Sequence, residues 1–262
     1  MDDRGAPRAI LITGASSGLG EALARAYAAP GVTLALTGRD GARLETCAAT
    51  CRAAGARVVT ATLDVTDSVA LAAWIAATDD AAPLDLVIAN AGVSGGTEGG
   101  DESDAQTRRI FAVNVEGVLN TVLPVIPRMR GRGRGQIALM ASLAAFRGFP
   151  GAPAYSASKA AVKTWGEALR GGLRGDGIAV SVICPGFVRT PMTDANPYPM
   201  PLLMEAERAA RIIRRGLAAN RARIAFPWPS YALIWLLAAL PPALADRLLG
   251  RLPEKPALPE RD

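Results

Sequence analysis

Short runs of aliphatic residues alternate with alanine-rich stretches along most of the chain. The run Leu84-Asp85-Leu86-Val87-Ile88-Ala89 is nearly all apolar, as expected for a strand that helices cover on both faces. This alternation is typical of repeated βαβ units around a parallel sheet. It predicts strands at 9–13, 33–37, 57–62, 84–89, 136–140, 179–184 and 223–226, and helices at 20–29, 41–54, 68–78, 102–130, 153–174 and 205–220.

Composition narrows the class without changing this picture. The chain has 262 residues, of which 50% are hydrophobic and 20% charged, so we expect one α/β domain over 1–262 and no disordered region. The net charge of +5 comes largely from arginine and slightly favours anionic partners. An arginine-glycine run at 128–135 is short and lies between a predicted helix and a predicted strand, so we interpret it as a solvated loop and expect no nucleic-acid partner.

The first residues and the cysteines indicate a cytoplasmic protein. The amino terminus is acidic and leads directly into an apolar strand, unlike the basic and then apolar layout of a signal peptide. The three cysteines, Cys47, Cys51 and Cys184, form no disulfide framework. Cys47 and Cys51 have helical spacing and could supply two metal ligands, but nothing completes such a site, so we expect packing cysteines and no metal.

Three polar residues suggest proton-transfer chemistry. Tyr155 precedes Lys159 by four residues, so on a helix the ammonium can approach the phenol and favour its ionised form. Ser142 lies thirteen residues before Tyr155, where a strand ends. The chain contains no histidine, so acid-base chemistry must use another group. By itself the Tyr155 and Lys159 spacing is also compatible with an ordinary surface helix pair.

A glycine-rich turn, Thr13–Gly20, follows the first predicted strand and opens a helix. Its spacing is G-x-x-x-G-x-G rather than the commoner G-x-G-x-x-G. Such a turn lets backbone N–H groups and a helix N-terminus approach a pyrophosphate. A plain tight turn is the alternative.

Taken together, Thr13–Gly20, Asn90-Ala91-Gly92, Asn114, Ser142, Tyr155, Lys159 and Pro185-Gly186 resemble the short-chain dehydrogenase/reductase family over about residues 9–190. The resemblance implies a Rossmann-type, doubly wound, mainly parallel seven-stranded sheet with helices on both faces. It also implies an oxidoreductase that interconverts a carbonyl and an alcohol by hydride transfer with a nicotinamide cofactor, commonly as a homodimer or homotetramer.

The resemblance also assigns residues to roles. Catalysis would use Ser142 to orient the substrate oxygen, Tyr155 to transfer the proton, Lys159 to lower the pKa of the phenol and hold the nicotinamide ribose, and Asn114 to hold a water in the proton relay. Asn114 as an ordinary helix amide and Asp64 as a turn or N-cap residue remain the alternatives. The residues expected to bind the cofactor are Gly14, Ser16, Ser17, Gly18, Leu19, Gly20, Arg39, Asp64, Val65, Asn90, Ala91, Gly92, Tyr155, Lys159, Pro185, Gly186, Val188 and Thr190.

The end of the second predicted strand bears on which nicotinamide is used. Gly38 stands where an acid would bind the 2′-hydroxyl of NAD, and Arg39 can meet a 2′-phosphate. We therefore expect NADP(H) to be preferred, with NAD(H) still accepted, because Ser17 supplies no second basic residue and Asp40 adjoins Arg39. A solvent-facing Arg39 is the alternative.

The last third of the chain concerns the substrate. Residues 190–207 are rich in proline and methionine and match the substrate lid of the family, which predicts an apolar carbonyl or alcohol. An apolar extension at 224–252 is interrupted by prolines and is too short to span a bilayer. It could cap the pocket, form a subunit interface or rest on a membrane surface, and we favour the first two. A membrane-associated enzyme for lipid-like substrates and a non-catalytic nucleotide-binding regulator are the alternatives.

Overall fold

Seven parallel strands form a single sheet in the computed structural model, which describes residues 5–250 and 255–258. The strands are β1 Ala9–Thr13, β2 Thr33–Gly38, β3 Arg57–Thr62, β4 Leu86–Ala89, β5 Gly135–Met140, β6 Ile178–Pro185 and β7 Arg223–Phe226. Their order is β3-β2-β1-β4-β5-β6-β7, so the order reverses between β1 and β4. In sheets of this kind, ligands bind beyond the carboxyl ends of the strands at such a reversal.

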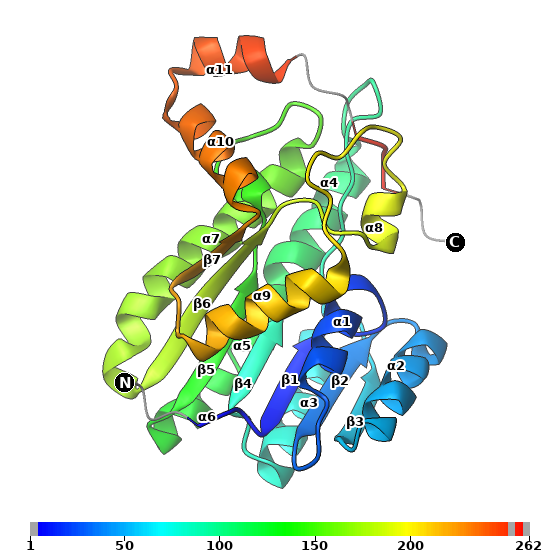
Figure 1. Ribbon diagram of the computed structural model, residues 1–262, viewed down its shortest axis with the longest axis vertical. Helices are drawn as coiled ribbons and strands as arrows, with labels where there is room; N and C mark the ends of the chain where they lie inside the picture. The colour runs from blue at the N-terminus through cyan, green and yellow to red at the C-terminus, as the bar shows by residue number, and fades with distance from the viewer. Residues whose placement is uncertain (1–4, 251–254, 259–262) are drawn as a thin grey trace.

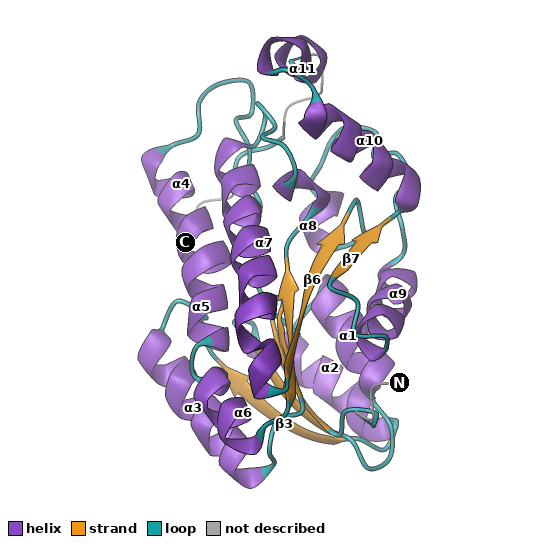
Figure 2. Cartoon of the chain, turned by 90° about the vertical axis from the view of Figure 1, so that its left-hand side faces the viewer, coloured by secondary structure: helices purple, strands orange, loops and turns teal. Residues whose placement is uncertain are grey.

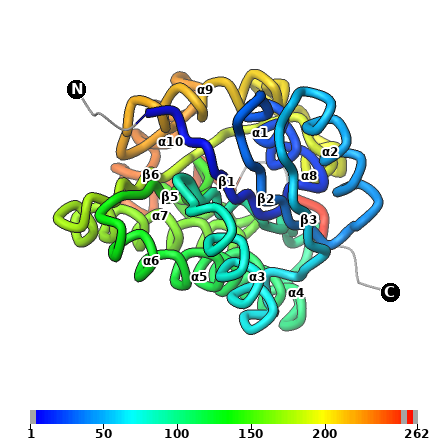
Figure 3. Tube along the Cα trace, turned by 90° about the horizontal axis from the view of Figure 1, so that it is seen from below, coloured from blue at the N-terminus to red at the C-terminus, as the bar shows by residue number. Residues whose placement is uncertain are grey.

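Helices cover both faces of the sheet (Figures 1 and 3). The helices are α1 Gly18–Tyr27, α2 Gly41–Ala53, α3 Ser68–Ala81, α4 Asp104–Phe111, α5 Gly117–Val122, α6 Val125–Arg132, α7 Pro153–Leu173, α8 Pro191–Asp194, α9 Ala206–Ala218, α10 Trp228–Ala239 and α11 Pro242–Leu249. One core cluster packs the helices from α3 through α7 against one face of the sheet. A second cluster packs α1, α2 and α9 against the other face. Leu11 belongs to the first cluster and its neighbours Ile10 and Ile12 to the second, as the alternation of a strand requires.

The predicted strands match the structure closely, and the predicted helix at 102–130 differs from it. A π-helical turn, Ala112–Glu116, separates α4 from α5, and Pro124 precedes α6. The arginine-glycine run is a solvated loop only in part. Its arginines up to Arg132 lie in α6, which ends at the left-handed Gly133. Arg128 and Arg132 form ion pairs with Asp79, so the run fastens α6 to α3.

The stretch Asp104–Arg132 is, within the described ranges, the one long helix whose length and composition would suit a membrane span, and half of its most apolar window is buried. Its buried residues belong to the first core cluster, as expected for a layer that covers the sheet. Cys47, Cys51 and Cys184 are buried and free. The described residues include no cluster of three or more His, Cys, Asp or Glu that could hold a metal ion.

The apolar carboxyl-terminal part is not one extension. Residues 224–226 belong to β7 and complete the sheet, because Ile224 and Phe226 alternate into the second core cluster. The part outside the sheet begins after Phe226 with α10 and α11, which project past the carboxyl ends of the strands (Figures 1 and 2). Pro229 is tolerated because it lies in the first turn of α10. Residues 251 and 252 of the predicted extension lie outside the described residues.

Replacing Asp79 by alanine is expected to lower the free energy of unfolding by about 2–3 kcal/mol. The Asp79 side chain is 3% exposed and accepts hydrogen bonds from Arg132 Nη1 at 2.7 Å and from Leu84 N at 2.9 Å. Its neighbour Asp80 pairs with Arg128 but is 67% exposed, so Asp80→Ala should cost at most about 1 kcal/mol. Urea unfolding of both variants measures the difference.

The pH dependence of that difference gives a second check. Burial by itself would raise the pKa of Asp79, but hydrogen bonds from Arg132 and Leu84 hold that pKa below its ordinary value. A lowered folded-state pKa stabilises the fold above the unfolded-state pKa, and this contribution is lost as the pH falls through the folded-state value. The gap between wild type and Asp79→Ala should therefore be full at neutral pH and shrink in acid. A gap that stays constant from neutral pH into strong acid would contradict the assigned ion pairs.

Candidate active site

The loop between β1 and α1 is shaped by glycines that leave no room for side chains. Gly14 and Gly18 have φ angles of 68° and 57°, which favour glycine. A Cβ atom at residue 20 would lie 2.1 Å from the Gly14 carbonyl oxygen. The loop and the N-terminus of α1 therefore form a cradle at the sheet edge that suits a pyrophosphate group.

Asn90 and Thr13 hold this turn against the end of β4. The Asn90 side chain donates to the Thr13 carbonyl oxygen at 2.9 Å and to that of Gly14 at 3.3 Å. Thr13 Oγ1 in turn accepts from the backbone N–H groups of Asn90 and Ala91, both at 3.1 Å. The side chain of Asn90 thus shapes the cofactor cradle by binding protein backbone, a role that its expected place beside the ribose did not include.

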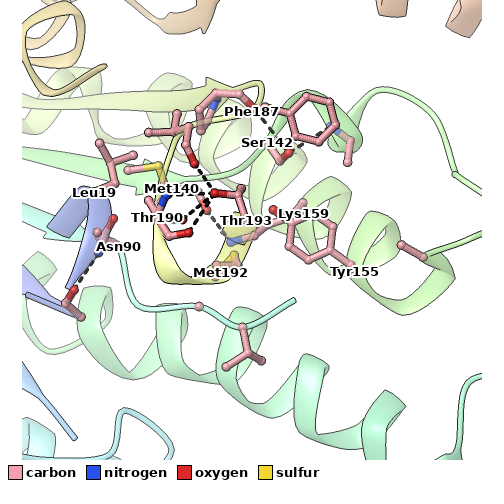
Figure 4. A pocket seen from close by; sticks show the side chains of 18 of the residues that line it. Leu19, Asn90, Met140, Ser142, Tyr155, Lys159, Phe187, Thr190, Met192 and Thr193 are labelled. Carbon is pink, nitrogen blue, oxygen red and sulfur yellow. Dashed lines mark hydrogen bonds between the residues drawn. The ribbon is translucent and has the colours of Figure 1, made fainter. Parts of the chain in front are cut away.

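A cavity of about 1130 Å³ opens at the carboxyl edge of the sheet. Every residue that the sequence assigned to the site lines it, except Asn114. In Figure 4 Leu19 and Asn90 lie towards one side of this cavity, and Lys159 and Tyr155 lie towards the other. The strand-end loops therefore bring together residues that are far apart in the sequence.

Ser142, Tyr155 and Lys159 meet at one end of the cavity. Ser142 caps the short 3-10 helix Leu143–Ala145, and its Oγ accepts from Ala144 N at 3.1 Å and donates to the Pro185 carbonyl oxygen at 3.5 Å. Tyr155 and Lys159 lie one turn apart on α7, with Lys159 Nζ 5.8 Å from the centroid of the Tyr155 ring. The i,i+4 spacing therefore places the cation over the ring of Tyr155, whereas the sequence led us to expect it at the hydroxyl.

The expected lowering of the Tyr155 pKa is wrong for this structure. Burial raises the pKa of the Tyr155 phenol above its ordinary value, and the hydrogen bond with Ser142 opposes this only in part. Lys159 Nζ donates to the Met140 carbonyl oxygen at 3.0 Å, and burial lowers the pKa of Lys159 to about 8. The ammonium is thus held by backbone instead of by the hydroxyl, and the phenol is protonated at neutral pH.

Asn114 lies behind the cavity wall, in the π-helical turn, and is fully buried. Its Oδ1 accepts from Val93 N at 2.8 Å, and its Nδ2 donates to the Val93 carbonyl oxygen at 2.9 Å and to Ser158 Oγ at 3.0 Å. The side chain therefore links the loop after β4 to α7. A Cβ atom at Gly92 would lie 3.1 Å from Asn114 Oδ1 and 3.2 Å from Lys159 Nζ, so this loop passes close to both.

Asp40, the acidic neighbour of Arg39 in the sequence, forms its ion pair with another arginine. Asp40 caps α2 and pairs with Arg43, whose Nε lies 2.6 Å from Asp40 Oδ2. Arg39 is exposed at the cavity rim, and within the described ranges no carboxylate lies at ion-pair distance from it. Arg43 also lines the cavity, so two guanidinium groups stand at this rim.

The remaining cofactor candidates have clear local roles. Asp64 Oδ1 accepts from the backbone N–H and the hydroxyl of Thr66, at 3.0 and 2.8 Å, which makes it a turn residue that also lines the cavity. Val65 is buried, and its carbonyl oxygen accepts from Asn120 Nδ2 at 2.9 Å. Thr190 caps α8, and its Cγ2 would lie 2.9 Å from a Cβ at Gly18, so the lid touches the glycine turn.

The rest of the cavity wall is mainly apolar and comes from the predicted lid and from α10. Tyr198 stacks edge-on against Phe187, with ring centroids 6.5 Å apart. The wall also includes Phe149, Met192, Pro199, Leu233, Ile234, Leu237 and Leu249. One face of α10 therefore caps the pocket, which is one of the two roles favoured from the sequence, and Trp228, Trp235 and Leu236 remain more than half exposed.

Sequence reasoning missed three cations of the cavity wall, namely Arg43, Arg109 and Lys255. Arg43 could have been found from its place one turn beyond Arg39. Arg109 and Lys255 carried no local signal, because α4 and the carboxyl-terminal segment reach the site only through the tertiary fold. Arg109 lies in α4 and Lys255 in the described segment 255–258.

Comparisons with known proteins agree with this geometry. The model of the short chain dehydrogenase family matches residues 8–199. An uncharacterized oxidoreductase of Myxococcus xanthus is 42% identical over 246 residues, which cover 94% of this chain and 97% of that protein. A 1-deoxy-11-beta-hydroxypentalenate dehydrogenase of Streptomyces exfoliatus is 33% identical over 263 residues, which cover 94% and 95% of the two chains.

A solved structure extends the likeness to three dimensions. A short chain dehydrogenase/reductase of Burkholderia phymatum in complex with NAD superimposes with a TM-score of 0.79 at 29% identity, over 98% of this chain and 99% of that one. The sheet order, the glycine turn and the paired Tyr155 and Lys159 thus occur in a chain that aligns with these proteins over 94% or more of its length. On this evidence the chain belongs to the short-chain dehydrogenase/reductase family of oxidoreductases.

Proposed function

We propose that this chain is an NADP(H)-preferring oxidoreductase that interconverts a carbonyl and an alcohol on an apolar small molecule. The observation that carries the proposal is a single cavity with the glycine turn on one side and Ser142, Tyr155 and Lys159 on the other (Figure 4). A non-catalytic nucleotide-binding regulator would need neither a protonated phenol nor a hydroxyl beside it. These groups therefore favour the enzyme.

The residues of the cavity fit a dinucleotide. Gly20 packs against Gly14, and Gly92 packs close to Lys159, so a side chain at either glycine would clash with these neighbours or fill the space for the cofactor. Gly14, Gly18, Gly20 and the N-terminus of α1 would hold the pyrophosphate, Asp64 and Val65 the adenine side, and Pro185, Gly186, Val188 and Thr190 the nicotinamide side. When bound, the nicotinamide supplies or accepts the hydride.

The chain's own residues then handle the substrate oxygen and its proton. Ser142 Oγ orients the carbonyl by a hydrogen bond that strengthens as negative charge develops on the oxygen. The Tyr155 hydroxyl, protonated at neutral pH, donates its proton to that oxygen in reduction and takes it back in oxidation. Lys159 would hold the ribose hydroxyls, and Asn114 keeps the loop at Val93 fixed against α7.

Replacing Arg39 by alanine is expected to raise the Kd for NADPH about tenfold or more and to change that for NADH less than about twofold. The reason is the loss of a charge-assisted hydrogen bond to the 2′-phosphate, which NADH lacks. Fluorescence titration of both cofactors measures the effect. Arg52→Ala is the control, because Arg52 lies on the neighbouring helix α2, pairs with Glu45 and does not line the cavity.

Arg43→Ala should weaken NADPH binding less, because Arg43 is already engaged by Asp40. Equal losses for NADPH and NADH in Arg39→Ala would remove the assigned 2′-phosphate role. Failure of the wild-type chain to bind either cofactor would refute the enzyme proposal itself. A carbonyl panel with the preferred cofactor then identifies the substrate class.

The exposed apolar residues of α10 and α11 support a second part of the proposal, namely that the chain forms a homodimer or homotetramer; we also propose that it works in the cytoplasm. Leu244 and Leu248 of α11 are each 50% exposed, and Trp228, Trp235 and Leu236 of α10 are exposed as well. An apolar face of this kind is usually covered by another surface. Light scattering measures the subunit number, and co-sedimentation with anionic vesicles tests the alternative of a membrane-surface enzyme for lipid-like substrates.

A further inference from the structure

The carboxyl-terminal segment 255–258 lies along the loop that follows β4. Gly96 N donates to the Pro256 carbonyl oxygen at 2.8 Å, and Glu98 N donates to that of Lys255 at 2.9 Å. A Cβ atom at Gly96 would lie 2.4 Å from Lys255 Cβ, so this loop is shaped to admit the segment. Backbone hydrogen bonds hold the segment in place, so its position does not depend on the Lys255 side chain.

The Lys255 side chain reaches the reacting end of the cavity. Its Nζ lies 5.2 Å from the centroid of the Tyr155 ring and donates to Ser94 Oγ. Lys255 lines the same cavity as Tyr155 and Ser142. An anion bound to this ammonium and a carbonyl bound to the Tyr155 hydroxyl would therefore lie only a few bonds apart.

The Lys255 ammonium has no ion-pair partner among the described residues, although Glu98 Oε2 accepts from Ala257 N in the same segment. Among the described residues that line the cavity, the only carboxylates are Asp40 and Asp64, and both follow strands at the adenosine end. No described carboxylate lies at ion-pair distance from Lys255 Nζ. Burial lowers the pKa of Lys255 to about 8, so the side chain is still mostly charged at neutral pH. A part-buried ammonium without a counterion gains much from an anionic ligand.

We propose that Lys255 is the anion-recognition group of the substrate site, so that the substrate is an apolar carbonyl or alcohol with a carboxylate a few bonds from the reacting carbon. This inference rests on the proposed function and adds the substrate class. The ammonium stands over the face of the Tyr155 ring, and the pKa of that phenol is set by burial, Ser142 and Tyr198. Lys255 therefore acts on the bound molecule and leaves the proton to Tyr155.

The test compares straight-chain 4-oxo and 5-oxo carboxylic acids of six to ten carbons with their methyl esters, using NADPH. We expect the wild type to prefer the acid, and Lys255→Met to lower the acid-to-ester ratio of kcat/KM about 10- to 100-fold, mainly through the KM of the acid. Lys255→Arg should restore the preference. Lys163→Met is the control, because Lys163 pairs with Glu167 outside the cavity and should leave the ratio unchanged.

Binding without turnover separates this inference from the proposed function. Calorimetry with octanoate and octanamide should show tighter binding of octanoate to the wild type and the loss of that difference in Lys255→Met. If no carbonyl is reduced but octanoate is still preferred through Lys255, the proposed function fails and the anion site stands. An equal acid-to-ester ratio in wild type and Lys255→Met, or equal binding of octanoate and octanamide to the wild type, would overturn the inference.

Discussion

Tyr155→Phe is expected to lower kcat about 10²- to 10⁴-fold while leaving the Kd for NADPH within about threefold of wild type. The substitution removes only the hydroxyl that protonates the substrate oxygen, and it preserves the ring that Lys159 and Lys255 contact. Stopped-flow or steady-state reduction of an accepted carbonyl gives kcat, and fluorescence titration gives the Kd.

Two further variants, one control and one expected to lose activity, test whether the Tyr155 result is specific. Tyr231→Phe removes a hydroxyl that accepts a hydrogen bond from Arg223 and does not line the cavity, so activity should be retained. Ser142→Ala should also lower kcat, because the substrate oxygen loses its second hydrogen bond. Wild-type turnover by Tyr155→Phe would refute the assignment of the proton donor and would leave Ser142 as the next candidate.

Gly20→Ala is expected to weaken NADPH binding about 100-fold or more. The new methyl group would lie 2.1 Å from the Gly14 carbonyl oxygen and 2.6 Å from Asn90 Nδ2, so the turn must move by a large part of an ångström. Misplacement on that scale at a positioning element typically costs about 10²-fold. Titration with NADPH measures the loss, and the midpoint of thermal unfolding reports whether the fold survives.

Gly171→Ala is the matched control for Gly20→Ala. Gly171 lies in α7, and no atom lies within 4 Å of a Cβ added there. The Gly171→Ala variant should therefore bind NADPH as the wild type does, and its helix should be more stable by up to about 1 kcal/mol. If Gly20→Ala instead binds NADPH as tightly as wild type in a folded chain, the pyrophosphate cradle is misassigned.

The inner strands could be predicted from the sequence because β1, β4 and β6 are buried on both faces and therefore read as continuous apolar runs. The edge strands β3 and β7 are partly exposed, yet they were, like β1, predicted to the residue. The helix ends were less certain, since α1 starts within the glycine turn and the long helix predicted at 102–130 contains a π-helical turn that holds Asn114. No periodicity marks such a turn, and its Asn114 is held by hydrogen bonds to Val93 and Ser158, which are distant in the sequence.

The site was predictable where chemistry is local. The glycine turn and the Tyr155 and Lys159 pair are short motifs whose spacing fixes their geometry. The direction of the Tyr155 pKa was not predictable from spacing, because it depends on burial and on Lys159 donating to Met140 instead. Lys255 was out of reach for a similar reason, since it is 161 residues away from Ser94 in the chain.

The clasp between Thr13 and Asn90 ties cofactor affinity to the integrity of the sheet. The two residues are 77 positions apart and share two hydrogen bonds, and two more run from Asn90 to Gly14 and from Ala91 to Thr13. All four form when β1 and β4 pair. The conformational entropy of the turn is therefore lost when the chain folds, so cofactor binding does not have to order the turn. Substitutions that weaken the pairing of β4 with β1 should raise the dissociation constant of the dinucleotide, although the substituted residues contact no phosphate. The affinity for the cofactor therefore reports how firmly these two central strands are paired.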